Sequence, residues 1–266
     1  MSIGDWEPNW LGPPSRVLYS AMHHATSPAS IGVVLVPPLL HEHPRSRRFV
    51  AEVASQLAAS GLPCLRFDFH GTGDSPGGGD EVDFASMAGD LEVATAALRS
   101  HTGVEQVVLL AWRGAALLAQ PWLQQGRQGD RVVLWEPIMD GAGWLRDLQR
   151  NDANERASRP RPRPGVPRTN LQDDGQLMGF AASPRLRQDL AEARVVQADP
   201  SQTASTWAVV HAGSPPLPFE VAKLFELPAG APTFDGGVAM EATMFLTPPL
   251  EHVVGQLGHA LRQQAG

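Results

Sequence analysis

The chain has 266 residues, of which 42% are hydrophobic, and a formal net charge of -7. This length and composition predict one large α/β domain that spans residues 1–266. The negative charge argues against a nucleic-acid partner. No apolar run approaches the roughly 18 residues that a membrane span needs.

The N-terminal segment and the cysteine content indicate a cytoplasmic protein. The first 20 residues contain no basic stretch followed by an apolar one, so no secretory signal is expected. Cys64 is the only cysteine, which excludes an internal disulfide and a multi-cysteine metal site. We therefore expect a cytoplasmic protein with no cofactor and no metal.

Apolar runs that recur along the chain predict strands. They cover residues 16–22, 31–37, 63–69, 106–112, 131–137, 206–212 and 238–246. Several are continuously apolar over five or six residues, which is typical of strands buried on both faces of a parallel sheet.

Segments with helical spacing lie between the strands. They cover residues 45–61, 83–103, 114–126 and 247–264, and Asp83 and Thr247 stand where an N-cap is favoured. The alternation predicts a mostly parallel sheet with helices on both faces. Residues 141–184 break this pattern, because they are polar and rich in proline and arginine. We expect them to form a lid-like insertion that includes a basic, extended loop at 156–168.

The segment LRFDFHGTGDSPGG, residues 65–78, follows a predicted strand. Its D-x-x-G-x-G-x-S pattern resembles the loop after the fourth strand of α/β-hydrolases. In that family the loop shapes the edge of the sheet. We therefore expect structural roles for Asp68, Asp74 and Ser75.

The segment VVLVPPLLHEHPRSRR, residues 33–48, occupies the place of the loop after the third strand. In α/β-hydrolases a backbone N–H of this loop helps to form the oxyanion hole, and the alignment puts Leu39 at that position. His41, Glu42 and His43 follow, and are candidates for a general base, a general acid or a ligand. A His-x-His pair without further ligands is weak support for a metal, so none is predicted.

The segment AWRGA, residues 111–115, has the form of a nucleophile elbow, in which small residues flank the nucleophile at two positions. Arg113 stands at the nucleophile position. Its guanidinium stays protonated and has no lone pair to attack a carbonyl, so an acyl-enzyme on this residue is excluded. Gly114 follows, and its N–H is the second candidate donor to an oxyanion.

The other positions of a Ser-His-Asp triad are also unfilled. The acid is expected near Ser214 or Pro215, and neither residue is acidic. The histidine is expected just before the final helix, where the sequence reads ATMFLTPP. His252 and His259 lie within that helix, and we expect both on the surface.

Three further candidates end predicted strands at the same edge as Arg113. Glu136 and Asp140 follow one strand, and His211 ends another. A carboxylate beside Arg113 predicts either a structural ion pair or an anion-binding pocket. His211 is either a satisfied buried histidine or a base.

Within the α/β-hydrolases, the chain resembles the type 2 exosortase A system-associated hydrolases. The segments that carry this resemblance are VPPLLHEHPRSRR, FDFHGTGDSPGG, LLAWRGAALLA, VVLWEPIMDG and QLMGFAASPRL. Members of that group also have an arginine at the elbow, and the resemblance implies a link to bacterial exopolysaccharide gene clusters. This chain departs from the pattern at Ala111 and Ala115, which replace glycines.

Three interpretations follow. The first is a degenerate hydrolase whose cleft binds a small molecule such as an acyl, lipid or glycan group, with Arg113, Leu39, Gly114, Glu136 and Asp140 as candidate binding residues. The second is an active esterase-like hydrolase in which His41, His43 or His211 activates a water. The third is a non-catalytic assembly or regulatory subunit. A homodimer is one expected assembly.

Overall fold

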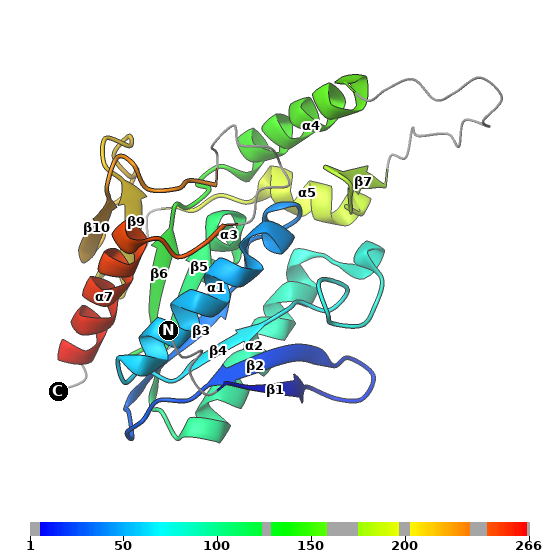
Figure 1. Cartoon of the computed structure of the whole chain (residues 1–266). Helices are drawn as coiled ribbons and strands as arrows, with labels where there is room; N and C mark the ends of the chain where they lie inside the picture. Colours follow the sequence, from blue (N-terminus) through cyan, green and yellow to red (C-terminus); the bar gives the residue numbers. More distant parts are fainter. Residues whose placement is uncertain (1–5, 124–128, 159–174, 197–202, 235–243, 265–266) are drawn as a thin grey trace.

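The computed structural model describes residues 6–123, 129–158, 175–196, 203–234 and 244–264. Its centre is an eight-stranded sheet in the order β1-β2-β4-β3-β5-β6-β9-β10 (Figure 1). The strands are β1 (Trp6–Leu11), β2 (Leu18–His23), β3 (Ile31–Val36), β4 (Cys64–Phe67), β5 (Gln106–Trp112), β6 (Arg131–Trp135), β9 (Thr206–His211) and β10 (Lys223–Leu227). All pairs from β4 to β10 are parallel, and β2 is antiparallel to both neighbours.

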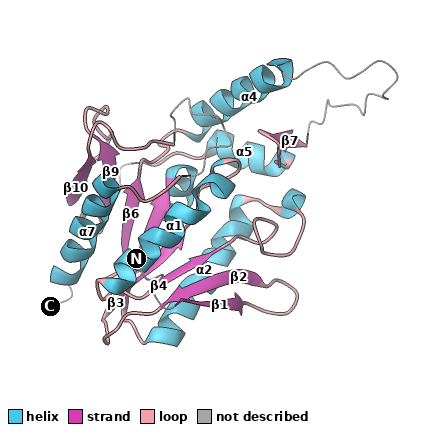
Figure 2. Ribbon diagram, viewed as in Figure 1, coloured by secondary structure: helices cyan, strands magenta, loops and turns pink. Residues whose placement is uncertain are grey.

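Helices cover both faces of the sheet (Figure 2). The helices α1 (Glu42–Ala59) and α7 (Pro248–Gln263) pack on one face, and α2 (Phe84–Thr102) and α3 (Ala116–Leu123) pack on the other. The helices α4 (Gly141–Ser158) and α5 (Pro184–Glu192) join the core on the side of α2 and α3. A short hairpin of β7 (Gln176–Leu177) and β8 (Phe180–Ala181) precedes α5.

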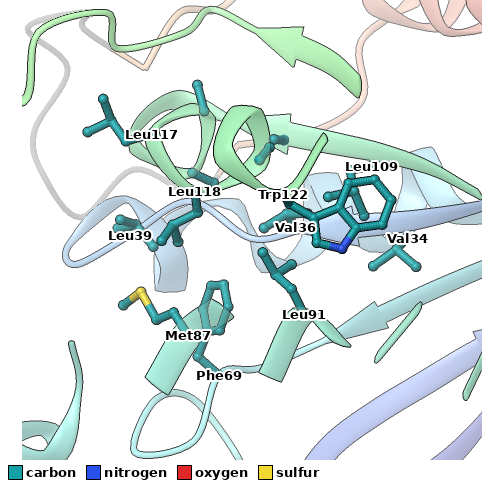
Figure 3. Close-up of a cluster of buried hydrophobic side chains, with 14 of the residues drawn as sticks. Val34, Val36, Leu39, Phe69, Met87, Leu91, Leu109, Leu117, Leu118 and Trp122 are labelled. Atoms are coloured by element: carbon teal, nitrogen blue, oxygen red, sulfur yellow. The ribbon is translucent and has the colours of Figure 1, made fainter. Parts of the chain in front are cut away.

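The central strands are buried because their sequences are continuously apolar. All six residues of β3 are buried, and six of the seven residues of β5 are. Figure 3 shows the core between the sheet and helices α2 and α3, where Val34, Val36 and Leu109 of the strands lie beside Leu91 and Trp122 of the helices. This rigid sheet fixes the positions of the loops at its carboxyl edge.

Six of the seven predicted strands are present, and the described residues of the seventh, at 238–246, form no strand. The last strand that the structure describes is β10, Lys223–Leu227, while residues 238–243 lie outside the described part and Met244–Leu246 form no strand. Only Phe225 and Leu227 of the sequence KLFEL are buried, because β10 is an edge strand, so it lacks a continuous apolar run. The edge strand β1 was not predicted for the same reason.

The predicted insertion at 141–184 contains more regular structure than its composition suggested. Its first part forms α4, because Trp144, Leu145 and Leu148 give that helix a buried stripe. Arg156 belongs to α4, whereas the rest of the predicted basic loop, residues 159–168, lies outside the described residues. None of the helices that the structure describes is long and apolar enough to cross a membrane.

Candidate functional site

The elbow prediction is confirmed by the backbone of Arg113. This residue lies between β5 and α3 with a φ of 55°, in the left-handed region that non-glycine residues seldom adopt. Ala111 and Ala115 are fully buried on either side. At Gly114 an added Cβ would stand 2.5 Å from the ring of Trp144, so α4 packs directly on the turn.

The side chain of Arg113 is buried, and the residue is 5% exposed. Its Nε donates to Oε1 of Glu42 at 3.1 Å, and its Nη1 donates to the backbone oxygen of Glu136 at 3.4 Å. The guanidinium also lies over the ring of Phe234, with its Cζ 5.9 Å from the ring centroid. The positive charge at the nucleophile position is thus matched by a buried carboxylate.

The carboxylate beside Arg113 is that of Glu42, where we expected Glu136 or Asp140. Glu136 has a φ of 44°, and its carboxylate accepts a hydrogen bond from Thr233 at 2.9 Å while its carbonyl faces Arg113. His211 Nε2 lies 3.3 Å from the same carboxylate. The carboxylate of Asp140 pairs with Arg194. The backbone turn after β6 therefore directs both predicted carboxylates away from Arg113.

The first turn of α1 brings two candidates to different neighbours. The strand before it, β3, lies between β4 and β5, and successive helix residues are rotated by about 100°. Glu42 therefore meets Arg113, which follows β5. His43 meets Asp68, which follows β4, and its Nε2 lies 3.0 Å from Oδ1 of Asp68.

Asp68 also anchors the glycine-rich loop. Its Oδ2 accepts from the N–H of Asp74 at 2.9 Å, and Arg47 lies 3.5 Å from the same oxygen. Burial raises the pKa of Asp68, but the hydrogen bond and charge of His43, the Asp74 N–H and Arg47 together hold that pKa below its ordinary value. The hydroxyl of Ser75 donates to the backbone oxygen of Asp68 at 2.6 Å and accepts from the N–H of Tyr19. Asp68 is therefore an ionised, structural carboxylate that also orients His43.

A pocket of about 300 Å³ opens beside His43. Its walls come from the loop after β3, the loop after β4, helix α2, the β7–β8 hairpin and helix α5. Leu39, Phe69 and Met87, labelled in Figure 3, lie close together at the edge of the core and line this pocket. The other residues that line it are Pro38, Leu40, His43, Gly71, Thr72, Gly73, Gly79, Val82, Gly179, Phe180, Ala181, Leu186 and Leu190.

Of the candidate site residues, Leu39 and His43 line the pocket. The remaining candidates do not: His41, Glu42, Arg113, Gly114, Glu136, Asp140 and His211. His41 is the N-cap of α1. Phe180, Leu186 and Leu190 also line the pocket and were not predicted from the sequence. The four-residue spacing of Leu186 and Leu190 in a polar segment was the one signal that could have indicated a helix with an apolar face.

When β10 is taken as the last strand, the positions of the acid and the histidine of a triad are still not filled by a buried carboxylate and a histidine. The histidine would follow β10, and residues 228–247 contain none. The loop between β9 and β10 has one carboxylate, Glu220, and it is exposed. Among the described residues, no group of three histidines, cysteines or carboxylates is arranged to hold a metal ion.

No protein-family model and no curated protein matches the chain. Solved structures match it over nearly its full length. An esterase from Pyrococcus furiosus is 12% identical, with a TM-score of 0.63, over 99% of this chain and 92% of that chain. Est1E from Butyrivibrio proteoclasticus, with ferulic acid bound, is 13% identical, with a TM-score of 0.61, over 96% of this chain and 98% of that chain.

A third match is an α/β serine hydrolase without a lid from Xanthomonas campestris. It is 13% identical, with a TM-score of 0.54, over 98% of this chain and 95% of that chain. This chain has the α/β-hydrolase fold. Such low identities establish the fold alone, so the chemistry of this α/β-hydrolase-fold protein has to be argued from its own residues.

Proposed function

We propose that this protein is a degenerate hydrolase that binds a small apolar ligand without forming a covalent intermediate. One observation carries the proposal: the nucleophile position holds a buried arginine, and that arginine forms an ion pair with Glu42. A guanidinium cannot attack a carbonyl, and one that is paired with a buried carboxylate is not available to hold an anionic ligand. In this proposal Arg113 has a structural role.

The ligand site is the pocket beside His43. Most of the side chains that line it are aliphatic or aromatic, as in the walls of small-molecule sites. An acyl or lipid chain suits such walls, because each buried methylene contributes about 0.8 kcal/mol. The lid-like part of the site is the β7–β8 hairpin with α5, which supplies Phe180, Leu186 and Leu190.

The resemblance to the type 2 exosortase A system-associated hydrolases supports a narrower proposal. The ligand then belongs to the acyl, lipid or glycan groups of exopolysaccharide export. The segments that carry the resemblance include the loop of Leu39 and the hairpin of Phe180, and both contribute to the pocket.

The absence of a covalent intermediate is tested with a fluorophosphonate probe and intact-protein mass spectrometry. We expect no adduct on the purified chain. An adduct at any serine, Ser75 and Ser214 included, would contradict the proposal.

Binding is tested by calorimetry with 1-octanol and with octanoyl and palmitoyl glycerides. The variant Ala181→Trp fills the pocket from an exposed position in β8 and is expected to abolish the heat of binding. Ala157→Trp is the matched control, since Ala157 is exposed on α4 and does not line the pocket. If no ligand binds, the third interpretation, a regulatory subunit with an inherited cleft, is favoured.

One observation favours a second candidate function, hydrolysis by an activated water. The pair of His43 and Asp68 lies on the pocket wall, and a histidine oriented by a carboxylate is a common general base. This alternative predicts turnover of an octanoyl ester that His43→Gln abolishes, with one oxygen of solvent water incorporated in the acid product. The proposed function predicts no turnover above that of the variant.

A further inference from the structure

The pocket beside His43 has two polar side chains, His43 and Thr72, among the described residues that line it. His43 is also its one titratable group. The residue is 9% exposed, so its ring is almost completely removed from water. The hydrogen-bonding state of these two side chains therefore influences which polar group a ligand can bring into the pocket.

The proton of a neutral His43 lies on Nε2. Asp68 is 3.0 Å from this nitrogen, and its lowered pKa keeps it an ionised carboxylate, which can only accept hydrogen bonds. Nε2–H therefore donates to Asp68, and Nδ1 keeps a lone pair. No described residue donates a hydrogen bond to Nδ1. Nδ1 is therefore an acceptor to which a ligand can donate.

Thr72 also presents a hydrogen-bond acceptor. Its hydroxyl donates to the backbone oxygen of Phe69 at 2.8 Å, so its proton is already used. The oxygen lone pairs of Thr72 can accept from a ligand. Both polar side chains of the pocket thus present acceptors.

We propose that this pocket selects a neutral amphiphile with a hydrogen-bond donor, such as a hydroxyl, at its polar end, and that Nδ1 of His43 accepts from that donor. The inference rests on the proposed function, because it needs a ligand in the pocket. A hydroxyl pairs with the acceptor. An ether oxygen or a carboxylate brings a second acceptor instead and leaves the acceptors of His43 and Thr72 unmatched.

The test compares ligands of similar size on the full chain by calorimetry at pH 7.5. The ligands are 1-octanol, its isomer heptyl methyl ether, and octanoate. We expect octanol to bind roughly three- to tenfold more tightly than the ether, which corresponds to one hydrogen bond. Octanoate is expected to bind more weakly than octanol. If the ether binds as tightly as the alcohol, the inference is overturned while the proposed function stands. If none of the three ligands binds, both fail.

Two variants separate recognition from a merely structural role. His43→Leu removes the acceptor, so the preference for octanol is expected to disappear while binding of the ether persists. Asp68→Asn replaces the carboxylate by an amide that can donate to Nε2, which moves the ring proton to Nδ1. The preference should then reverse, toward the ether and octanoate.

The exposed variant His252→Leu is the matched control and should retain the preference for the alcohol. An alcohol preference that survives His43→Leu would exclude His43 as the recognising group. The comparison of ligands on the unmodified chain tests the inference even if Asp68→Asn does not fold.

Discussion

Arg113 and Glu42 form an ion pair at the carboxyl edge of two neighbouring parallel strands, with Nε and Oε1 3.1 Å apart and side chains that are 6% and 3% exposed. Together they link the elbow after β5 to the first turn of α1, where the acidic side chain also suits the positive end of the helix. The nucleophile position has thereby become part of the packing of the domain.

The first prediction concerns the free energy of unfolding of this pair. Arg113→Met leaves the Glu42 charge buried, and Glu42→Gln leaves the guanidinium buried, so each is expected to destabilise the protein by about 3–5 kcal/mol. The double variant should lose clearly less than the sum of the two, because both single variants break the same ion pair. Urea unfolding of all four proteins measures this coupling.

The exposed pair of Arg150 and Asp147 is the control, with an expected coupling of roughly 0.2–1 kcal/mol. Strictly additive effects at Arg113 and Glu42 would exclude the pair as a structural unit.

The second prediction concerns the contact between the elbow and α4. Gly114→Ala places a Cβ 2.5 Å from the Trp144 ring and is expected to destabilise the fold by about 1–3 kcal/mol. Gly89→Ala is the matched control. Gly89 lies in the interior of α2 with no atom within 4 Å of the added Cβ, so this change should stabilise the helix by roughly 0.5–1 kcal/mol. Thermal unfolding measures the melting temperature of the two variants. Equal changes in melting temperature would mean that α4 does not pack on the turn.

The third prediction is a loss of stability in mild acid that His23 causes. Burial first, and then the charges of Arg66 and His24, lower the pKa of His23 from 6.5 to about 4. Between these values the unfolded chain binds a proton that the folded chain does not, so the free energy of unfolding should fall as the pH drops from 6.5 to 4. His23→Gln removes this part of the pH dependence, whereas the exposed His259→Gln should not. Urea unfolding at pH 7 and pH 5 measures the difference. The prediction is contradicted if the free energy of unfolding of His23→Gln falls between pH 7 and pH 5 as much as that of the unmodified protein.

The fourth prediction concerns Asp68 at lower pH. Its folded pKa is depressed, so its contribution to stability is fully present above the unfolded pKa of about 4 and is lost as the pH falls through the folded value. Asp68→Asn is therefore expected to lower the free energy of unfolding at pH 7. The difference in this free energy between the variant and the unmodified protein should become smaller at pH 3. Asp74→Asn changes a half-exposed carboxylate of the same loop and should produce a smaller gap. If this difference in the free energy of unfolding does not change with pH, the charge of Asp68 does not contribute to stability.

Local patterns predicted much of this architecture. Continuous apolar runs located the inner strands, because a strand buried on both faces admits few polar residues. Small residues around Arg113 located the elbow, because a left-handed turn packed between strands has no room for larger ones. The edge strands β1 and β10 carry polar residues on an exposed face, so their sequences lack this signal.

The sequence alone established that the elbow of this protein carries an arginine and that no histidine stands just before the final helix, since residue identity excludes that chemistry whatever the fold. Tertiary structure decided which groups meet. Glu42 and His43 are adjacent in the chain, yet one pairs with Arg113 and the other with Asp68. The reason is that β3 lies between β4 and β5, and one step along a helix turns a side chain by about 100°. Strand order depends on pairing between residues far apart in the sequence, and local patterns do not report it.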